Sequence, residues 1–447
     1  MQPTPVRSSL LPLTLLAAAA GAGSGFICGL FRLALREADN LRIAFPENWR
    51  DLPLPWRLLP PGWRDQPIVG CLLMVGIAAA ATAFSAWLVR RFMPTAAGSG
   101  IPRVEAVIDG ELPPAPFALL PVKFLGGLLA IGSGLALGRE GPCVQMGATL
   151  AHRMGKLFGR NEADGRSLLA AGAGAGLAAA FNAPLAGSAF VLEELIKKFE
   201  MRNAVAALGA SASAIVVARL LTGPEPDFFV ASLPYPDASD NLLCLALGGV
   251  AGLLGVVYNR TLLGALALAD RLANWPVEVR AGLIGAAVGA LAWFAPGLVG
   301  GGDEITQTTL IGAEPLALLP LFFLVRLVLG SASYAAGTPG GLFAPLLVLG
   351  AQMGFFFGAL CHPDPGTSAT HAIMFAVVGM AAFFTTVVRA PLTGIILVTE
   401  MTANSRLLLP MLAACFSAMA LATMLGEPPL YDSLKERTLR GSQGKPG

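Results

Sequence analysis

Long apolar stretches dominate this chain, and short breaks rich in glycine and proline separate them. A membrane-spanning helix needs about 20 mostly apolar residues. The stretches that meet or approach that length are Leu10–Leu30, Ile68–Val89, Phe117–Leu137, Leu168–Leu192, Ala204–Leu221, Leu242–Val257, Ala281–Val299, Leu316–Leu329, Leu342–Leu360, Ala372–Val388 and Leu407–Leu425. Several are short or interrupted by glycine. We therefore expect an all-α integral membrane protein with more than ten embedded segments, many of them tilted or broken.

The glycine and proline breaks recur at a nearly constant distance. Three motifs return 202, 203 and 207 positions later: Pro94, Gly98 and Gly100 as Pro296, Gly300 and Gly302; Gly138, Pro142 and Gly147 as Gly341, Pro345 and Gly350; Ala183-Pro184-Leu185, Gly187, Val191 and Glu193 as Ala390-Pro391-Leu392, Gly394, Val398 and Glu400. This order predicts an internal duplication, with repeats at 10–221 and 242–425, a connecting loop at 222–241 and a tail at 426–447. Paired interrupted helices in two halves of a transporter point to a site near the membrane midplane.

Composition supports the bilayer as solvent. Of the 447 residues, 55% are hydrophobic and 13% charged, whereas soluble domains carry about 25% charged residues. The mean hydropathy is +0.67. The net charge is +2 without a basic block, so we expect no nucleic-acid partner.

The first apolar stretch begins like a signal peptide and is followed by a more polar segment. Leu10–Ala22 resembles a signal peptide, but the apolar character continues through Phe31, so we expect a retained first span. Arg36–Gln66 is rich in proline and tryptophan and is expected to lie outside the membrane, at the interface.

Cysteine and histidine give no sign of catalysis or metal binding. The six cysteines are scattered through apolar runs, and His152, His362 and His371 do not group in the sequence. We expect no metal site, no catalytic residues and no cofactor. An intramembrane enzyme would need a Ser/His pair, paired aspartates or a metal cluster, none of which this pattern predicts.

Two of the breaks have the character of an anion site. Residues 94–102 read PTAAGSGIP, and residues 138–142 read GREGP after a long apolar run. Inside a membrane, irregular backbone is tolerated only where it lines a cavity or is buried in protein. A break followed by a new helix presents free N–H groups and the positive end of the helix dipole, which together bind anions. Ser99 could add a hydroxyl donor or serve as a plain helix N-cap.

Glu140 is the most informative single residue. A carboxylate at membrane depth costs about 2.5–3.5 kcal/mol on insertion scales and usually marks an ion pathway or a proton relay. Among N–H groups suited to an anion, the carboxylate of Glu140 would compete with that anion, and protonation would release the site. The alternative is that GREGP is a water-exposed loop in which Arg139 simply pairs with Glu140.

These residues resemble the CLC family of chloride channels and chloride/proton exchangers. The segments that carry the resemblance are GSGIP at 98–102, GREGP at 138–142, GLAAAFNAPLAG at 176–187 with Glu193-Glu194, GTPGGLFAP at 337–345 and PLY at 429–431. The resemblance extends over about residues 94–438. It implies an inverted-topology repeat of many tilted and broken helices, in a homodimer with one pore per subunit.

The resemblance also implies roles for particular residues. The anion would be held by the hydroxyls of Ser99 and Tyr431, by the segment that contains Gly100 and Ile101, and by the amides of Leu342 and Phe343. Glu140 would be the external gating glutamate and Glu194 the internal proton-transfer glutamate, with Arg139, Glu105 and Glu193 as accessory residues. Without the resemblance, Glu193 and Glu194 are typical of a solvated helix end, Tyr431 of an interfacial aromatic and Phe343 of core packing.

The resemblance favours a chloride/proton antiporter in a bacterial inner membrane, because exchangers of the family keep both glutamates. The alternatives are a passive voltage- or pH-gated chloride channel and a fluoride/proton antiporter on the same fold. The expected partners are chloride, protons, the lipid bilayer and a second copy of the chain. Two departures stand out: the short N-terminus leaves little room for a cytoplasmic helix, and no paired CBS domains are expected in the tail.

Overall fold

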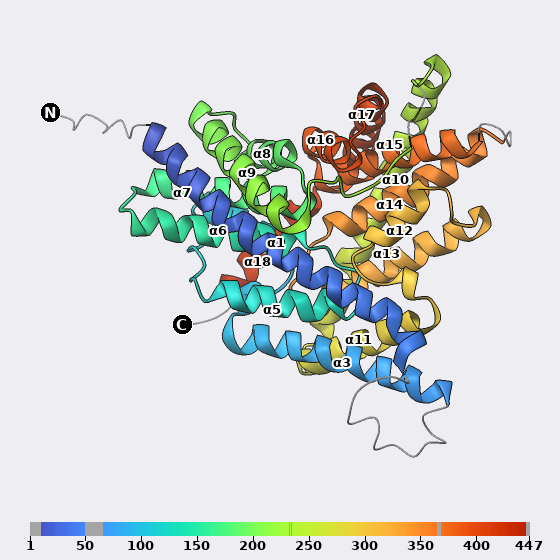
Figure 1. Ribbon diagram of the computed structural model, residues 1–447, viewed down its shortest axis with the longest axis horizontal. Helices are drawn as coiled ribbons and strands as arrows, with labels where there is room; N and C mark the ends of the chain where they lie inside the picture. The colour runs from blue at the N-terminus through green and yellow to red at the C-terminus, as the bar shows by residue number, and fades with distance from the viewer. Residues whose placement is uncertain (1–9, 50–65, 232, 234, 364–367, 444–447) are drawn as a thin grey trace.

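The computed structural model describes residues 10–49, 66–231, 233, 235–363 and 368–443, and these residues form a helical bundle (Figure 1). In the first half the helices are α1 Leu10–Asn48, α3 Pro67–Phe92, η3 Pro94–Ala96, α4 Ile101–Ile108, α5 Leu119–Gly132, α6 Glu140–Leu157, α7 Glu162–Phe181, α8 Pro184–Phe190, η4 Val191–Leu195 and α9 Met201–Thr222. Among these described residues β-structure is confined to two isolated bridges, Gly98–Pro339 and Gly138–Gly341.

The second half repeats this order of long, short and broken helices. It contains α10 Ala238–Arg271, α11 Val277–Phe294, η5 Pro296–Leu298, α12 Asp303–Leu310, η6 Leu316–Leu318, α13 Leu319–Ala335, α14 Phe343–Cys361, α15 Ser368–Val388, α16 Pro391–Thr402, α17 Leu408–Met424 and α18 Leu430–Gln443. The pairs η3/η5, α4/α12, α6/α14, α8/α16 and α9/α17 begin at the spacings found in the sequence. The exact repeat boundaries at residues 10–221 and 242–425 remain predictions.

Eight of the described helices are long and apolar enough to cross a membrane, and three shorter apolar helices accompany them. Two expectations need correction. The first helix does not end near Leu30, because α1 continues unbroken to Asn48; that residues 36–48 lie at the membrane interface remains a prediction, and residues 50–65 lie outside the described residues. Leu168–Leu192 is not one span: Asn182 adopts the left-handed conformation at the end of α7, and Pro184 begins α8.

Small residues let the helices of each half approach closely. A Cβ atom at Gly147 or Gly172 would collide with the backbone carbonyl of the other, which locks α6 against α7. Gly350 and Gly379 make the same reciprocal contact between α14 and α15 in the second half. Membrane helices associate through such close packing because lipid supplies no hydrophobic driving force between them. The two broken helices that carry the site, α6 and α14, are thereby held rigidly.

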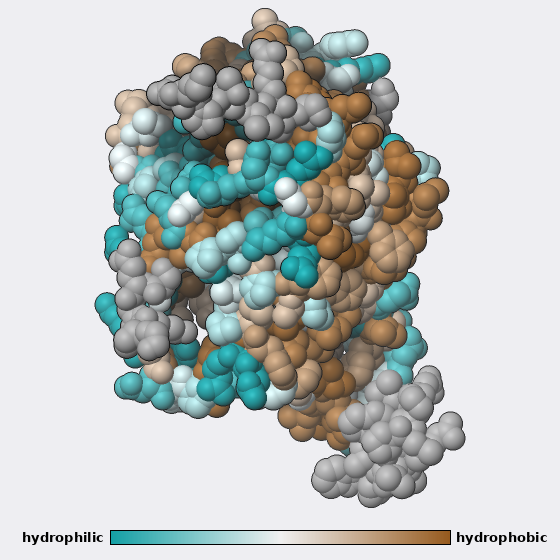
Figure 2. Space-filling model, turned by 90° about the vertical axis from the view of Figure 1, so that its left-hand side faces the viewer, coloured by the Kyte–Doolittle hydropathy of each residue, from teal (hydrophilic) through white to brown (hydrophobic). Residues whose placement is uncertain are grey.

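Large apolar side chains remain exposed on the outside of the bundle. Figure 2 shows a broad hydrophobic area beside hydrophilic side chains on one side of the molecule. The exposed side chains include Leu208 and Val216 of α9 and Leu412 and Phe416 of α17. A water-soluble monomer rarely exposes so much contiguous apolar surface, and a lipid or protein environment accounts for it.

Candidate functional site

Two backbone bridges hold the broken segments of the halves together at the centre of the molecule. Gly138 and Gly341 exchange both N–H···O bonds, at 2.8 and 2.7 Å. The N–H of Gly98 donates to Thr338 at 3.0 Å, and the N–H of Gly340 donates back to Gly98 at 3.1 Å. These bridges bring the N-termini of α4, α6 and α14 to one place, and each N-terminus presents N–H groups that its own helix leaves unpaired.

Glu140 lies at this convergence. It is the first residue of α6 and is fully buried. Its Oε1 atom accepts the N–H of Phe343, the first residue of α14, at 2.6 Å. The N–H groups of Ala344 and of Glu140 itself also act on this carboxyl group. The carboxylate therefore occupies the position that an anion would take at the positive end of α14.

The space for this carboxylate depends on glycine at two positions. A Cβ atom at Gly138 or at Gly341 would overlap the Glu140 carboxyl group. The bridge between these two glycines thus serves two purposes: it joins the halves and leaves room for the Glu140 side chain. This close approach explains why both members of the duplicated motif carry glycine there.

The predicted hydroxyl ligands lie beside this centre. Ser99 and Tyr431 are both fully buried, and among the described residues neither the Ser99 Oγ nor the Tyr431 hydroxyl oxygen has a hydrogen-bond partner. The two side chains lie close enough to interact with each other. A buried hydroxyl without a partner is unusual, because desolvation of the group is left uncompensated. An anion between these two donors would satisfy both.

The other residues predicted around the anion are also buried. Gly100 is the left-handed N-cap of α4 with φ of 87°, Ile101 begins that helix, and Leu342 is the N-cap of α14. Phe343 packs edge to face with Phe190, Phe384 and Tyr431, at centroid distances of 5.8, 4.7 and 5.8 Å. Its ring therefore belongs to an aromatic cluster, while its N–H faces Glu140.

A buried lysine fixes the loop that carries Ser99. The Lys123 ammonium, on α5, donates to the carbonyls of Ala96 at 2.9 Å and Gly98 at 2.8 Å. In the second half Arg326 of α13 does the same for the loop before α12, donating to Gly300 at 2.9 Å. The two cations are 203 positions apart, as the motifs around them are. We refer to them as the loop clamps.

A cavity of about 750 Å³ reaches from the surface to the residues around Glu140. Gly138, Arg139 and Ala344 line its inner part. Arg139 does not pair with Glu140: it forms ion pairs with Asp227 at 2.8 Å and Asp303 at 2.7 Å. The alternative of a water-exposed loop with an Arg139–Glu140 pair is therefore wrong, because Glu140 is buried and Arg139 is engaged elsewhere.

Glu194 lies at the opposite face. It is in the π-helical turn η4, is 4% exposed, and is followed by α9. Helix α9 is long enough to cross a membrane, and its last residue, Thr222, lines the cavity that leads to Glu140. The two glutamates are therefore approached from opposite ends of α9.

Charged side chains surround Glu194 at this face. Lys197 bonds to Glu105 at 2.8 Å and to Asp432 at 3.0 Å. Partial burial alone would lower the pKa of Lys197, but the hydrogen bonds to Glu105 and Asp432 outweigh it and raise that pKa. Lys435 of α18 also pairs with Glu105, at 3.8 Å. Glu194 thus lies next to a partly exposed charged cluster that contains Glu105.

Glu193 has a different environment from its neighbour. Its carboxylate accepts the N–H groups of Leu392 at 3.0 Å and Thr393 at 2.7 Å, at the start of α16. Glu400 makes the equivalent contacts at the start of α8, with Leu185 at 3.1 Å and Ala186 at 2.8 Å. Each short helix is capped by the glutamate of the other, so these two N-termini are occupied by protein carboxylates.

Sequence reasoning missed the partners that hold the site in place. Asp227 and Asp303 are remote from Arg139 in the sequence, and no local pattern indicates that they meet it. The role of Lys123 as a loop clamp was not predicted either. The duplication was the available signal: Lys123 and Arg326 share the spacing of the glycine motifs.

A family model, related protein sequences and solved structures all match this chain over most of its length. The family model described as voltage gated chloride channel matches residues 81–423. The H(+)/Cl(-) exchange transporter ClcA of Vibrio parahaemolyticus is 35% identical over 443 residues, covering 98% of this chain and 92% of that protein. Its counterpart in Vibrio cholerae is 39% identical over 370 residues, covering 80% and 78%.

Solved structures share the fold over nearly the whole chain. The crystal structure of a slow cyanobacterial Cl-/H+ antiporter superposes with a TM-score of 0.87 at 31% identity, covering 96% of this chain and 98% of that one. A CLC-type fluoride/proton antiporter superposes with a TM-score of 0.76 at 22% identity, covering 94% and 97%. The second likeness concerns the fold alone.

Proposed function

This chain belongs to the voltage-gated chloride channel family, the CLC family, and from that premise we propose that it exchanges chloride for protons across a bacterial inner membrane. The observation that carries the proposal is the Glu140 carboxylate, which accepts the Phe343 N–H at 2.6 Å. The buried hydroxyls of Ser99 and Tyr431 lie beside it and have no hydrogen-bond partner within the part of the chain that the structure describes. The relatives named as H(+)/Cl(-) exchange transporters support the choice of ions.

In the first half of the cycle, Glu140 competes with chloride. The ionised carboxylate occupies the N-terminus of α14, so the path from the cavity to Ser99 and Tyr431 is blocked. Protonation removes the charge that holds the carboxylate against the Phe343 N–H. Chloride then replaces it, because the helix N-terminus favours a negative charge. One site thus takes either the carboxylate or chloride, which couples protonation to anion movement.

In the second half of the cycle, the proton reaches Glu140 from the opposite face. Glu194 accepts it from the charged cluster of Glu105 and Lys197. Between the glutamates lies apolar material: Phe190 is four residues before Glu194, and its ring contacts Phe343, whose N–H bonds Glu140. No ionisable side chain bridges this stretch in these contacts, so transient water would carry the proton. Tight coupling follows from that apolar barrier.

The proposed homodimer rests on an apolar face. Helices α8, α9, α16 and α17 lie against one another, and they expose Leu185, Leu392, Leu412 and Phe416. Leu185 and Leu392 are equivalent residues of the two halves, and each is 57% exposed. A second copy would cover this face symmetrically. Tryptophan in place of both leucines should shift the purified protein toward monomer in light scattering, whereas an unchanged mass would contradict this interface.

Two other functions are possible on this fold, and the same experiment separates them. The protein is placed in liposomes with a chloride gradient as the driving force, voltage is fixed with a potassium ionophore, and external pH and chloride are recorded together. We expect protons to move uphill and to reverse when the chloride gradient is reversed. Chloride movement without protons would indicate a passive channel. Fluoride movement in place of chloride would indicate a fluoride/proton antiporter.

A second variant tests the inner glutamate. Glu194→Gln should abolish proton movement and leave chloride movement, because glutamine has nearly the same shape but carries no exchangeable carboxyl proton. Unchanged proton movement in this variant would contradict the role proposed for Glu194, and would leave it as a carboxylate at a helix end.

A further inference from the structure

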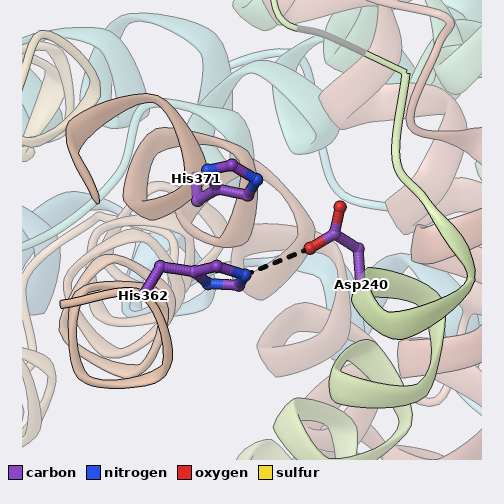
Figure 3. Close-up of side chains that lie close together, drawn as sticks. All are labelled: Asp240, His362 and His371. Carbon is purple, nitrogen blue, oxygen red and sulfur yellow. Dashed lines mark ion pairs between the residues drawn. The ribbon is translucent and has the colours of Figure 1, made fainter. Parts of the chain in front are cut away.

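Two histidines and an aspartate that are far apart in the sequence meet in the second half of the molecule. Asp240 is in the first turn of α10, His362 is the C-cap of α14, and His371 is in the first turn of α15. One ligand atom from each lies within 4.8 Å of the others. Figure 3 shows both imidazole rings with a nitrogen turned toward the Asp240 carboxylate.

The two rings are arranged for a shared partner. The His362 and His371 rings stack with centroids 4.2 Å apart and planes 15° from parallel. A neutral imidazole offers one nitrogen lone pair, so the two rings can supply two nitrogen ligands. The His362 Nε2 atom is 3.5 Å from the Asp240 Oδ1 atom, which is longer than a good charge-assisted hydrogen bond. A cation between these atoms would replace this weak contact.

The Asp240 side chain is fixed and incompletely satisfied. It is 5% exposed, and its Oδ2 atom accepts the N–H of Asp237 at 3.1 Å in a capping box. The Oδ1 atom, which faces the histidines, has no hydrogen-bond partner among the described residues, and neither has the His362 Nδ1 atom. A buried carboxylate oxygen without a donor is costly. It is also a ligand held in place before any ion binds.

We propose that Asp240, His362 and His371 bind a divalent transition-metal ion of the Zn²⁺ class. Two imidazole nitrogens and one carboxylate oxygen suit Zn²⁺ rather than Mg²⁺ or Ca²⁺, which prefer oxygen ligands alone. Three protein ligands leave one position of a tetrahedral site for water. Small inward rotations of the side chains complete the site, because zinc–ligand bonds of about 2.0–2.2 Å need the ligand atoms closer than 4.8 Å.

The bound ion would tie together three helices that the polypeptide connects only through loops. Helix α14 begins at Phe343, beside Glu140, and ends next to His362, so it carries the metal site and the anion centre at opposite ends. At 1.5 Å per residue these ends are about 28 Å apart. The ion would join α10, α14 and α15 and would stabilise the second half. This inference does not depend on the ions that the protein transports.

Calorimetric titration of Zn²⁺ into the purified, chelator-treated full chain tests the site. We expect the wild type to bind one Zn²⁺ ion per chain. In His362→Gln and in His371→Gln, the zinc affinity should fall more than about tenfold or be lost, since even outer partners of metal ligands contribute about 10–100-fold. His152→Gln is the matched control, because His152 is the remaining histidine of the sequence and lies on α6. Cys361→Ser tests whether the thiol beside His362 contributes.

Thermal unfolding gives an independent readout. A ligand that binds only the folded state raises the midpoint of unfolding, so Zn²⁺ should raise it in the wild type and in His152→Gln. The increase should disappear in the His362→Gln/His371→Gln double variant, whose own midpoint without zinc reports whether it folds. Equal zinc binding in the double variant, or no zinc binding by the wild type, would overturn the proposal and leave a His362–Asp240 ion pair only.

Discussion

Replacing Lys123 by methionine should weaken both the fold and chloride binding. The Lys123 ammonium is fully buried and bonds the carbonyls of Ala96 and Gly98, which precede Ser99. Methionine fills similar space but donates no hydrogen bond. The Ala96 carbonyl would then lack its donor, at about 1–3 kcal/mol, whereas the Gly98 carbonyl would keep the N–H of Gly340. The loss stays net unfavourable, because a hydrogen bond that involves a charged group contributes about 1.5–3 kcal/mol after desolvation is included.

The net expectation for Lys123→Met is a destabilisation of about 1–3 kcal/mol. Ser99 would also lose its fixed position, so we expect chloride affinity to fall about tenfold, which corresponds to about 1.4 kcal/mol. Thermal unfolding in detergent measures the first effect, and calorimetric chloride titration of the same preparation measures the second.

Arg326→Met is the matched control for Lys123→Met. Arg326 is the loop clamp of the second half and bonds the carbonyls before α12, whose loop lines the cavity. We expect a similar loss of stability with a smaller loss of chloride affinity. If Lys123→Met has the unfolding midpoint and the chloride affinity of the wild type, the hydrogen bonds of Lys123 contribute neither to stability nor to chloride binding. If Arg326→Met reduces chloride affinity as much, the link from Lys123 to Ser99 is refuted.

Three further predictions follow from the same contacts. Glu193→Gln and Glu400→Gln should each lower stability by about 0.3–2 kcal/mol, because each removes a negative charge from a helix N-terminus; unfolding midpoints equal to the wild type would contradict this capping role. Gly341→Ala should displace the Glu140 carboxyl group and reduce proton coupling, whereas Gly249→Ala, which meets open space, should leave it unchanged; equal coupling in both variants would refute the steric argument. Tyr431→Phe removes a buried hydroxyl but keeps the ring, so chloride affinity should fall in calorimetric titration without loss of stability, and an unchanged affinity would exclude that hydroxyl as a ligand.

The fold could be predicted largely from the sequence because its glycine and proline breaks are duplicated. The backbone must leave a helix at Gly98 and Gly138, and the same residue types return at Gly300 and Gly341. Hydrophobic length alone was less informative. It did not predict that α1 continues through Asn48, because a polar helix end looks like a loop when its partners are unknown.

Site residues could be predicted only where neighbouring residues in the sequence made their chemistry unusual. Glu140 was apparent because a carboxylate among apolar residues and glycine breaks is costly. Its neighbours Asp227 and Asp303 were not, because the ion pairs with Arg139 join segments far apart in the chain. The cluster of Asp240, His362 and His371 was missed for the same reason: three helices bring these side chains together, and their spacing in the sequence carries no recognisable metal motif.

The central claim is that the Glu140 carboxylate and chloride compete for one site and that this competition couples the two ions. Its most direct test is Glu140→Gln in liposomes, with chloride and proton movement recorded together under a chloride gradient. The account predicts that chloride continues to move while proton movement stops, because glutamine keeps the shape of the side chain and cannot carry the proton. Proton movement driven by the chloride gradient at the wild-type ratio would contradict it.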